Sequence, residues 1–157
     1  MLGGLTAQFL KLKTKEMQKD RYLFRGYIKY PSDIINGFWY GDLIHYANGD
    51  IYIRQFETGM ENEVIPESVG QWTGILDKNG VEIYEGDILL DVEFDENGNN
   101  ISSKFPVVYD YSKCQFAIDN SFKKDGSNLV NFVEYFGIEN LEVVGNICDN
   151  IEMLFSF

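Results

Sequence analysis

The residues that decide the fold are Trp72-Thr-Gly-Ile-Leu-Asp-Lys-Asn-Gly-Val-Glu-Ile-Tyr-Glu-Gly-Asp-Ile88. In this segment, two runs of aliphatic and aromatic residues flank the polar sequence Asp77-Lys-Asn-Gly80. An Asn-Gly pair supplies the positive φ angles that a tight turn needs, so the segment predicts a β-hairpin. The strand that follows, from Gly86 to Phe94, alternates aliphatic and acidic residues. This period of two predicts one buried face and one solvated face.

Similar signals on both sides of this hairpin predict further strands. Asn48-Gly49 is predicted to close a second hairpin, and Pro66 indicates a strand edge or the entry to a loop. Asn150 is predicted to cap a short C-terminal helix that ends at Phe155. Residues 129–136 fit either a strand or a short helix. The other expected strands are 22–30, 38–46, 51–56, 102–111, 114–118 and 142–148.

Residues 1–20 differ from the rest of the chain because Leu5, Phe9 and Leu12 recur at helical spacing. The same region carries a basic set, made of Lys11, Lys13, Lys15, Lys19 and Arg21. Two interpretations stay open: a short amphipathic helix, or a poorly ordered extension with Met17 as an alternative start.

The predicted fold class is mainly β, as a β-rich α+β domain over residues 21–157. Its antiparallel hairpins are expected to form a small barrel-like sheet or a two-part sheet, with short N- and C-terminal helices. Tyr40-Gly-Asp-Leu-Ile44 resembles Glu85-Gly-Asp-Ile-Leu89, and Val69-Gly-Gln-Trp72 resembles Val144-Gly-Asn-Ile147. Two related halves, 21–74 and 75–157, are therefore one interpretation. Repeated strand-entry chemistry, with Gly at a bend and Asp capping it, is the other.

Composition bounds the class of protein. A length of 157 residues favours one compact domain. The 25 acidic and 13 basic residues give a net charge of −12, which repels phosphate backbones and disfavours nucleic-acid binding. Cys114 and Cys148 form no zinc or CxxC pattern and are expected to be buried as small hydrophobes. Without a disulfide framework, signal peptide or apolar span, a cytoplasmic location away from membranes is expected.

The sequence contains no strong catalytic motif. His45 is the single histidine and has no neighbouring Cys, Ser or acidic cluster. Asp42 and Asp87 each follow Gly at a strand entry, where the favoured role of the carboxylate is to accept hydrogen bonds from local backbone N–H groups. The polar segment Asp95–Asn100 lacks the pattern of a calcium loop and is interpreted as a turn. No phosphate-binding glycine motif occurs. We therefore predict no catalytic, cofactor-binding or metal-binding residues.

The run from Val69 to Leu89 resembles the signature of the YopX family, small proteins encoded by phages, prophages and other mobile elements. Three further segments support the resemblance, namely Arg21-Tyr-Leu-Phe-Arg-Gly26, Trp39-Tyr-Gly-Asp-Leu-Ile44 and Glu142-Val-Val-Gly-Asn-Ile147. The resemblance implies a mostly β fold in the cytoplasm of a bacterial host, with no established enzymatic activity, cofactor or catalytic residue. The shared positions are interpreted as a structural motif made of Gly74, Asn79, Gly80, Tyr84, Gly86 and Asp87.

These observations lead to three hypotheses for function. The first is a non-enzymatic accessory protein of a phage or mobile element that acts through an unidentified protein partner and forms a homo-oligomer. The second is a nucleic-acid-associated factor that uses the basic residues 11–21 and sheet aromatics. The third is an uncharacterised hydrolase built on Asp42, Asp87 or His45.

A substitution in the signature tests its structural role. Gly80→Val should lower the free energy of unfolding by about 1 kcal/mol or more, because a β-branched residue resists positive φ. Asp87→Asn is expected to be mild. Urea unfolding of both variants measures the difference, and an unchanged unfolding midpoint for Gly80→Val would contradict the assigned turn.

Overall fold

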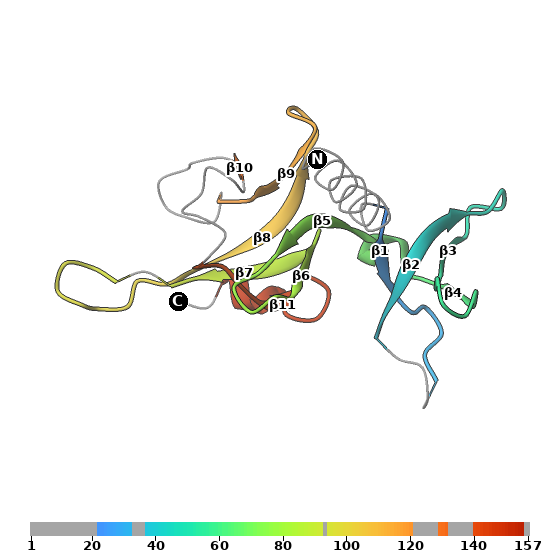
Figure 1. Cartoon of the computed structure of the whole chain (residues 1–157), viewed down its shortest axis with the longest axis horizontal. Helices are drawn as coiled ribbons and strands as arrows, with labels where there is room; N and C mark the ends of the chain where they lie inside the picture. Colours follow the sequence, from blue (N-terminus) through green and yellow to red (C-terminus); the bar gives the residue numbers. More distant parts are fainter. Residues whose placement is uncertain (1–21, 33–36, 93, 121–128, 132–139, 156–157) are drawn as a thin grey trace, which may run out of the picture. The chain divides into compact units, whose positions relative to one another are not determined.

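The computed structural model describes residues 22–32, 37–92, 94–120, 129–131 and 140–155, and the described part of the chain is mainly β (Figure 1). It also contains two 3-10 helices, η1 (Pro66–Ser68) and η3 (Ile151–Leu154). The strands are β1 (Phe24–Tyr27), β2 (Phe38–His45), β3 (Ile51–Arg54), β4 (Glu61–Glu63), β5 (Gly70–Leu76), β6 (Glu82–Tyr84), β7 (Asp87–Asp91), β8 (Ser103–Asp110), β9 (Gln115–Ile118), β10 (Val130–Asn131) and β11 (Glu142–Asn146).

Two compact units make up the chain, and the boundary between them lies between Gly74 and Ile75. All pairing between the strands whose register is known is antiparallel. The first unit, called unit 1, has the strand order β4-β3-β2-β1-β5. The second, called unit 2, has the order β10-β9-β8-β7-β11, together with the β5–β6 hairpin. β5 continues through the boundary.

The core of unit 1 is built from residues that alternate along its strands. Ile53 and Val64 are almost fully buried, and Gly26 lies so close to Val64 that an added Cβ would be 2.8 Å from its side chain. An isolated bridge joins Ile28, which follows β1, to Val64, which follows β4, so these two strands approach each other. Lys29 N–H donates to Glu63 O (2.9 Å) at the same place. The strands nevertheless form no closed barrel in the described residues, and the barrel-like alternative is wrong.

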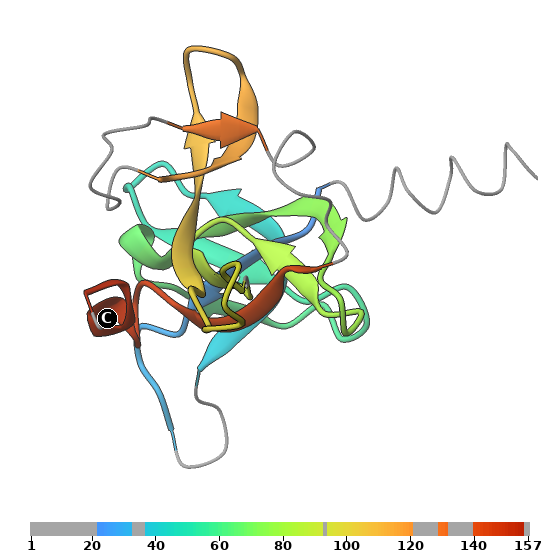
Figure 2. The ribbon, with the colours of Figure 1, turned by 90° about the vertical axis from the view of Figure 1, so that its left-hand side faces the viewer.

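Unit 2 is organised by β8, whose first half pairs with β7 and whose second half pairs with β9. Figure 2 shows this long strand running into its hairpin with β9. The buried cluster of this unit consists of Ile83, Leu89, Phe105, Val107, Ile118 and Leu141. β7 lies between β8 and β11, and both of its faces are covered. The prediction that one face is solvated is therefore wrong, because Asp87 and Asp91 are 1% and 2% exposed.

The predicted Asn-Gly hairpins are present, but their turns are of another type. Among the described residues other than glycine, only Cys114 has a positive φ. Gly49, Gly80 and Gly98 have φ angles of 95°, 81° and 81°, while the preceding asparagines do not. These turns are three-residue loops in which a glycine in the left-handed region makes a G1 bulge. An added Cβ at Gly80 would meet nothing within 4 Å, so its φ alone sets the cost of substitution.

The turn of the β5–β6 hairpin is attached to β11 by Asp77. This side chain is 6% exposed, and its Oδ1 accepts the N–H groups of Asn79 (2.7 Å) and Val81 (2.9 Å). Its Oδ2 accepts Val143 N–H (3.0 Å). Next to it, Lys78 N–H donates to Leu141 O (2.9 Å). The Lys78 ammonium also pairs with Glu142 at 2.6 Å. We call this set of contacts the Asp77 latch.

Two glycines that look equivalent in the sequence have different roles. Gly41 lies inside β2, and an added Cβ would be 1.9 Å from the Arg54 carbonyl oxygen. Gly86 lies in the turn before β7, with a φ of 83°. The strand partners also differ, since β11 pairs directly with β7 whereas β5 pairs with β1. Duplication of the two halves and repeated strand-entry chemistry stay the two interpretations.

Several local predictions need correction. The C-terminal helix is wrong, because Ile151–Leu154 is a single 3-10 turn that Asn150 does not cap with its side chain. Asn150 Oδ1 instead accepts Asn146 N–H of β11 (3.3 Å). Cys114 and Cys148 are exposed, since both lie in turns that follow strands. The N-terminal helix or extension, residues 1–20, lies outside the described residues. So do residues 132–136 of the last ambiguous segment, whose Val130–Asn131 is strand β10.

The Asp77 latch predicts acid sensitivity. Burial raises the pKa of Asp77, but the N–H groups of Val143, Val81 and Asn79 outweigh it and bring the pKa below its ordinary value of 3.8. A lowered pKa stabilises the folded state above the ordinary pKa, and this stabilisation is lost as the pH falls through the folded pKa. We expect urea unfolding measured against pH to show a loss of stability below 3.8. Asp77→Asn should weaken that dependence, and an identical pH profile would contradict it.

Candidate interaction surface

The outer face of unit 1 carries an ordered set of polar and aromatic side chains. Alternate residues of a strand share a face, so Tyr52 and Arg54 of β3 point the same way. Glu63 and Glu61 of β4 are their respective cross-strand partners. Tyr46 follows β2 and Lys29 follows β1. We call this set the tyrosine–glutamate face, and it consists of Lys29, Tyr46, Tyr52, Arg54, Glu61 and Glu63.

Glu61 is held by two partners on neighbouring segments. Tyr46 OH donates to Glu61 Oε2 (2.7 Å). Arg54 Nε donates to Glu61 Oε1 (2.8 Å), and its Nη2 lies 2.6 Å from the same oxygen. The carboxylate therefore receives a hydroxyl on one oxygen and a guanidinium on the other.

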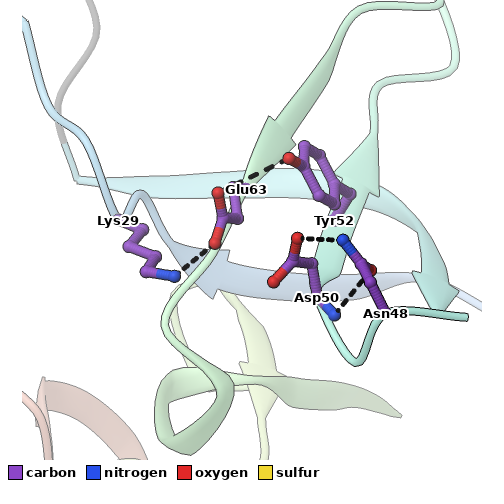
Figure 3. Close-up of polar contacts among 5 residues, drawn as sticks. All are labelled: Lys29, Asn48, Asp50, Tyr52 and Glu63. Carbon is purple, nitrogen blue, oxygen red and sulfur yellow. Dashed lines mark hydrogen bonds and ion pairs between the residues drawn. The ribbon is translucent and has the colours of Figure 1, made fainter. Parts of the chain in front are cut away.

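Glu63 repeats this arrangement with a weaker hydroxyl contact. Tyr52 OH lies 3.4 Å from Glu63 Oε2, and Lys29 forms an ion pair with Oε1 (Figure 3). The rings of Tyr46 and Tyr52 meet edge to face, with centroids 5.1 Å apart and an interplanar angle of 81°. Edge-to-face packing is a preferred aromatic geometry. The two Tyr–Glu–cation sets are thus joined by their rings.

Hydrogen bonds, burial and neighbouring charges shift the pKa of five side chains of this face, namely Lys29, Tyr46, Tyr52, Arg54 and Glu61. The hydrogen bond from Tyr46, followed by that from Arg54, lowers the pKa of Glu61. The same bonds raise the pKa of Tyr46 and of Arg54. Burial, then Glu63, raises the pKa of Tyr52, and the contact with Glu63 raises the pKa of Lys29. These shifts oppose a role as nucleophile or general base, which needs a pKa near the working pH.

The residues predicted as a structural motif lie at three places. Asn79 and Gly80 form the β5–β6 turn, and Gly74 (φ 84°) is in β5 at the unit boundary. Tyr84, Gly86 and Asp87 come together at the β6–β7 turn. Asp87 Oδ2 accepts Tyr84 N–H (2.8 Å), and Gly86 N–H donates to Val107 O (2.9 Å). Asp87 is buried and accepts this hydrogen bond. The structure therefore gives no reason to expect that Asp87→Asn has only a mild effect on stability.

The residues named for the hydrolase hypothesis have ordinary strand positions. His45 is exposed at the end of β2, opposite Ile51, and Asp42 faces Arg54 across the β2–β3 pair. Asp87 belongs to unit 2. Asp95 Oδ1 accepts the N–H groups of Asn97 and Asn99 (both 2.8 Å), which fits its predicted role in a turn.

Within the described ranges, no group of three or more His, Cys, Asp or Glu residues is placed to hold a metal ion. The helices of the same residues include none that is long and apolar enough to cross a membrane.

Sequence reasoning missed both the Asp77 latch and the tyrosine–glutamate face. Alternation of Tyr52 with Arg54 and of Glu61 with Glu63 could have indicated that these side chains share a face. The partners of Asp77 could not have been found in this way, because Val143 is 66 residues away in the chain.

Comparison with known proteins rests on a match that covers most of the chain. The sequence model of the family described as YopX protein matches residues 23–155. The chain belongs to the YopX family. No curated protein matches it. The YopX match includes β1 through η3, so both units lie within the family region.

One titration tests the geometry of this face. Tyr46→Phe keeps the ring but removes the hydroxyl that is the largest cause of the lowered Glu61 pKa. We expect the pKa of Glu61 to rise toward its ordinary value of 4.5, as followed by NMR of the carboxyl carbon. Tyr52→Phe is the matched control and should leave Glu61 unchanged, since its hydroxyl contacts Glu63. Equal responses in the two variants would refute the assigned pairing.

Proposed function

We propose that this YopX protein is a non-enzymatic accessory protein of a phage or other mobile element, acting through a protein partner in the bacterial cytoplasm. The observation that carries this proposal is the tyrosine–glutamate face of unit 1. Its side chains are paired with one another, and Tyr46 and Arg54 remain 45% and about half exposed, respectively.

The composition of the face supports protein recognition. Tyrosine and arginine are enriched in the buried centres of protein interfaces and among the residues that dominate binding energy. Unit 1 exposes further large apolar side chains, namely Tyr22, Tyr30, Tyr40, Phe56, Met60 and Ile65. Such side chains add apolar contact area when a partner covers them.

The fixed geometry supports the same proposal. Binding costs free energy when rotamer-rich side chains must be ordered. Tyr46, Arg54 and Glu61 are already held by mutual hydrogen bonds, and the tyrosine rings are packed against each other. A partner would therefore meet a surface that needs little reorganisation, as in rigid aromatic binding sites.

Self-association through strand edges is disfavoured in two places. Lys29 N–H bonds the end of β4, Val143 N–H of β11 bonds Asp77, and Lys78 N–H bonds Leu141, the residue just before β11. Because open edges are what template strand pairing between chains, the homo-oligomer that we expect would form through side-chain faces. Light scattering coupled to size exclusion measures this oligomeric state.

The proposal is tested by crosslinking in a host cell during induction of the mobile element. The unmodified chain is compared with a Tyr46→Ala, Tyr52→Ala double variant and with Tyr111→Ala as the matched control. Tyr111 is 83% exposed in unit 2. We expect the unmodified chain and the control to crosslink one protein through unit 1, and the double variant to lose it.

Thermal unfolding of all three chains checks that each is folded. Capture of the same protein by the folded double variant would refute a role for the tyrosine–glutamate face. The proposed function itself would be refuted if no protein crosslinked to the unmodified chain, or if the purified chain turned over a substrate.

A further inference from the structure

Three hairpin turns in the described residues carry the pair Asn-Gly, at Asn48, Asn79 and Asn97. The three turns share one backbone arrangement, in which the glycine N–H donates to the carbonyl oxygen three residues earlier, that of Tyr46, Asp77 or Asp95, at 2.9, 3.0 and 2.9 Å, respectively. All three asparagines are exposed. Glycine has no side chain to shield its nitrogen, so in this pair the backbone nitrogen can reach the asparagine side-chain carbon when the turn opens. The surroundings of the three turns decide where this happens.

Asn48 is held by its own side chain. Its Nδ2 donates to Asp50 Oδ2 (2.6 Å), and its Oδ1 accepts Asp50 N–H (3.1 Å), as Figure 3 shows. Both polar atoms of the amide are therefore engaged. Rotation of the amide carbon toward Gly49 N requires that these two bonds break.

Asn79 is held by the structure around its turn. Its side chain has no hydrogen bond among the described residues, but the turn belongs to the Asp77 latch. Opening it would disturb the bond from Val143 to Asp77 and the ion pair between Lys78 and Glu142. Segments with such tertiary contacts open less often than segments with few.

Asn97 lies on the least anchored of the three turns. Its side-chain amide bonds the Asp95 carboxylate of its own turn, and this contact is weaker than those of Asn99 with the same carboxylate. The hairpin depends on the isolated bridge between Phe94 and Asn100 and on the bonds to Asp95. Phe94 is 65% exposed, so this arm buries little apolar surface. We propose that Asn97 is a site of spontaneous deamidation and that it is modified well before Asn48 and Asn79.

The reaction is balanced by solvent water alone. Gly98 N attacks the side-chain carbon of Asn97, a new N–C bond forms, and the bond to Nδ2 breaks. Ammonia leaves with the proton that Gly98 N gives up. Water then opens the five-membered imide at either carbonyl, which leaves an aspartate or an isoaspartate at position 97.

Both products change this arm. The new carboxylate adds a negative charge two residues from Asp95. Isoaspartate also adds a methylene to the main chain, which displaces the N–H groups of residues 97 and 99 from Asp95 Oδ1. The bridge between Phe94 and Asn100 is then expected to open, while the Asp77 latch stays intact.

The test incubates the folded full chain at mildly alkaline pH and separates aspartyl from isoaspartyl peptides by mass spectrometry. We expect Asn97 to convert about tenfold or more faster than Asn48 or Asn79, since unanchored loop tips open most easily. In urea, where the turns are absent, the three rates should converge. Asp50→Ala should accelerate Asn48 and leave Asn97 unchanged, with thermal unfolding as the check on folding.

The proposal is overturned if Asn48 or Asn79 converts as fast as Asn97 in the folded chain. It is also overturned if Asn97 converts in urea but stays intact in the folded chain. Asn97→Gln is the negative control for the assigned peptide. None of these outcomes depends on the identity of a binding partner.

Discussion

The Asp77 carboxylate is the contact on which the arrangement of unit 2 depends. It closes its own turn through Asn79 and Val81, and it also accepts the N–H of Val143 on a strand far away in the sequence. A buried backbone N–H without an acceptor costs about 1–3 kcal/mol. The Asp77 side chain accepts three backbone N–H groups, those of Asn79, Val81 and Val143, and so avoids this cost. The same contact covers the edge of β11 and so limits pairing with another chain.

Unit 1 uses carboxylates in a different way. Glu61 and Glu63 lie on the outer face, where each is paired with a tyrosine hydroxyl and a cation. Exposed ion pairs contribute little stability, so the value of this arrangement lies in fixing side chains rather than in strengthening the fold. This YopX domain therefore combines carboxylates that hold its turns with carboxylates that order a surface.

Local sequence was a good guide wherever neighbouring residues decide the structure. The Asn-Gly pairs marked the hairpins at Gly49 and Gly80, because a glycine in the left-handed region is a local requirement. The type of turn was missed, since the hydrogen bonds that the Asp77 and Asp95 carboxylates accept from loop N–H groups favour the three-residue form. The solvated face assigned to β7 was also wrong, because alternation does not reveal that Asp87 is buried and accepts the Tyr84 N–H.

The sequence by itself determined the mainly β class, the positions of the hairpins and the resemblance to YopX, because turn chemistry and strand periodicity act over a few residues. Only the tertiary structure decided that Asp77 reaches Val143, that Gly41 must lack a side chain beside Arg54, and that Tyr46 and Arg54 share Glu61. These features depend on strand register, which places residues far apart in the chain within hydrogen-bond distance. The physical reason is that register is set by the packing of whole strands.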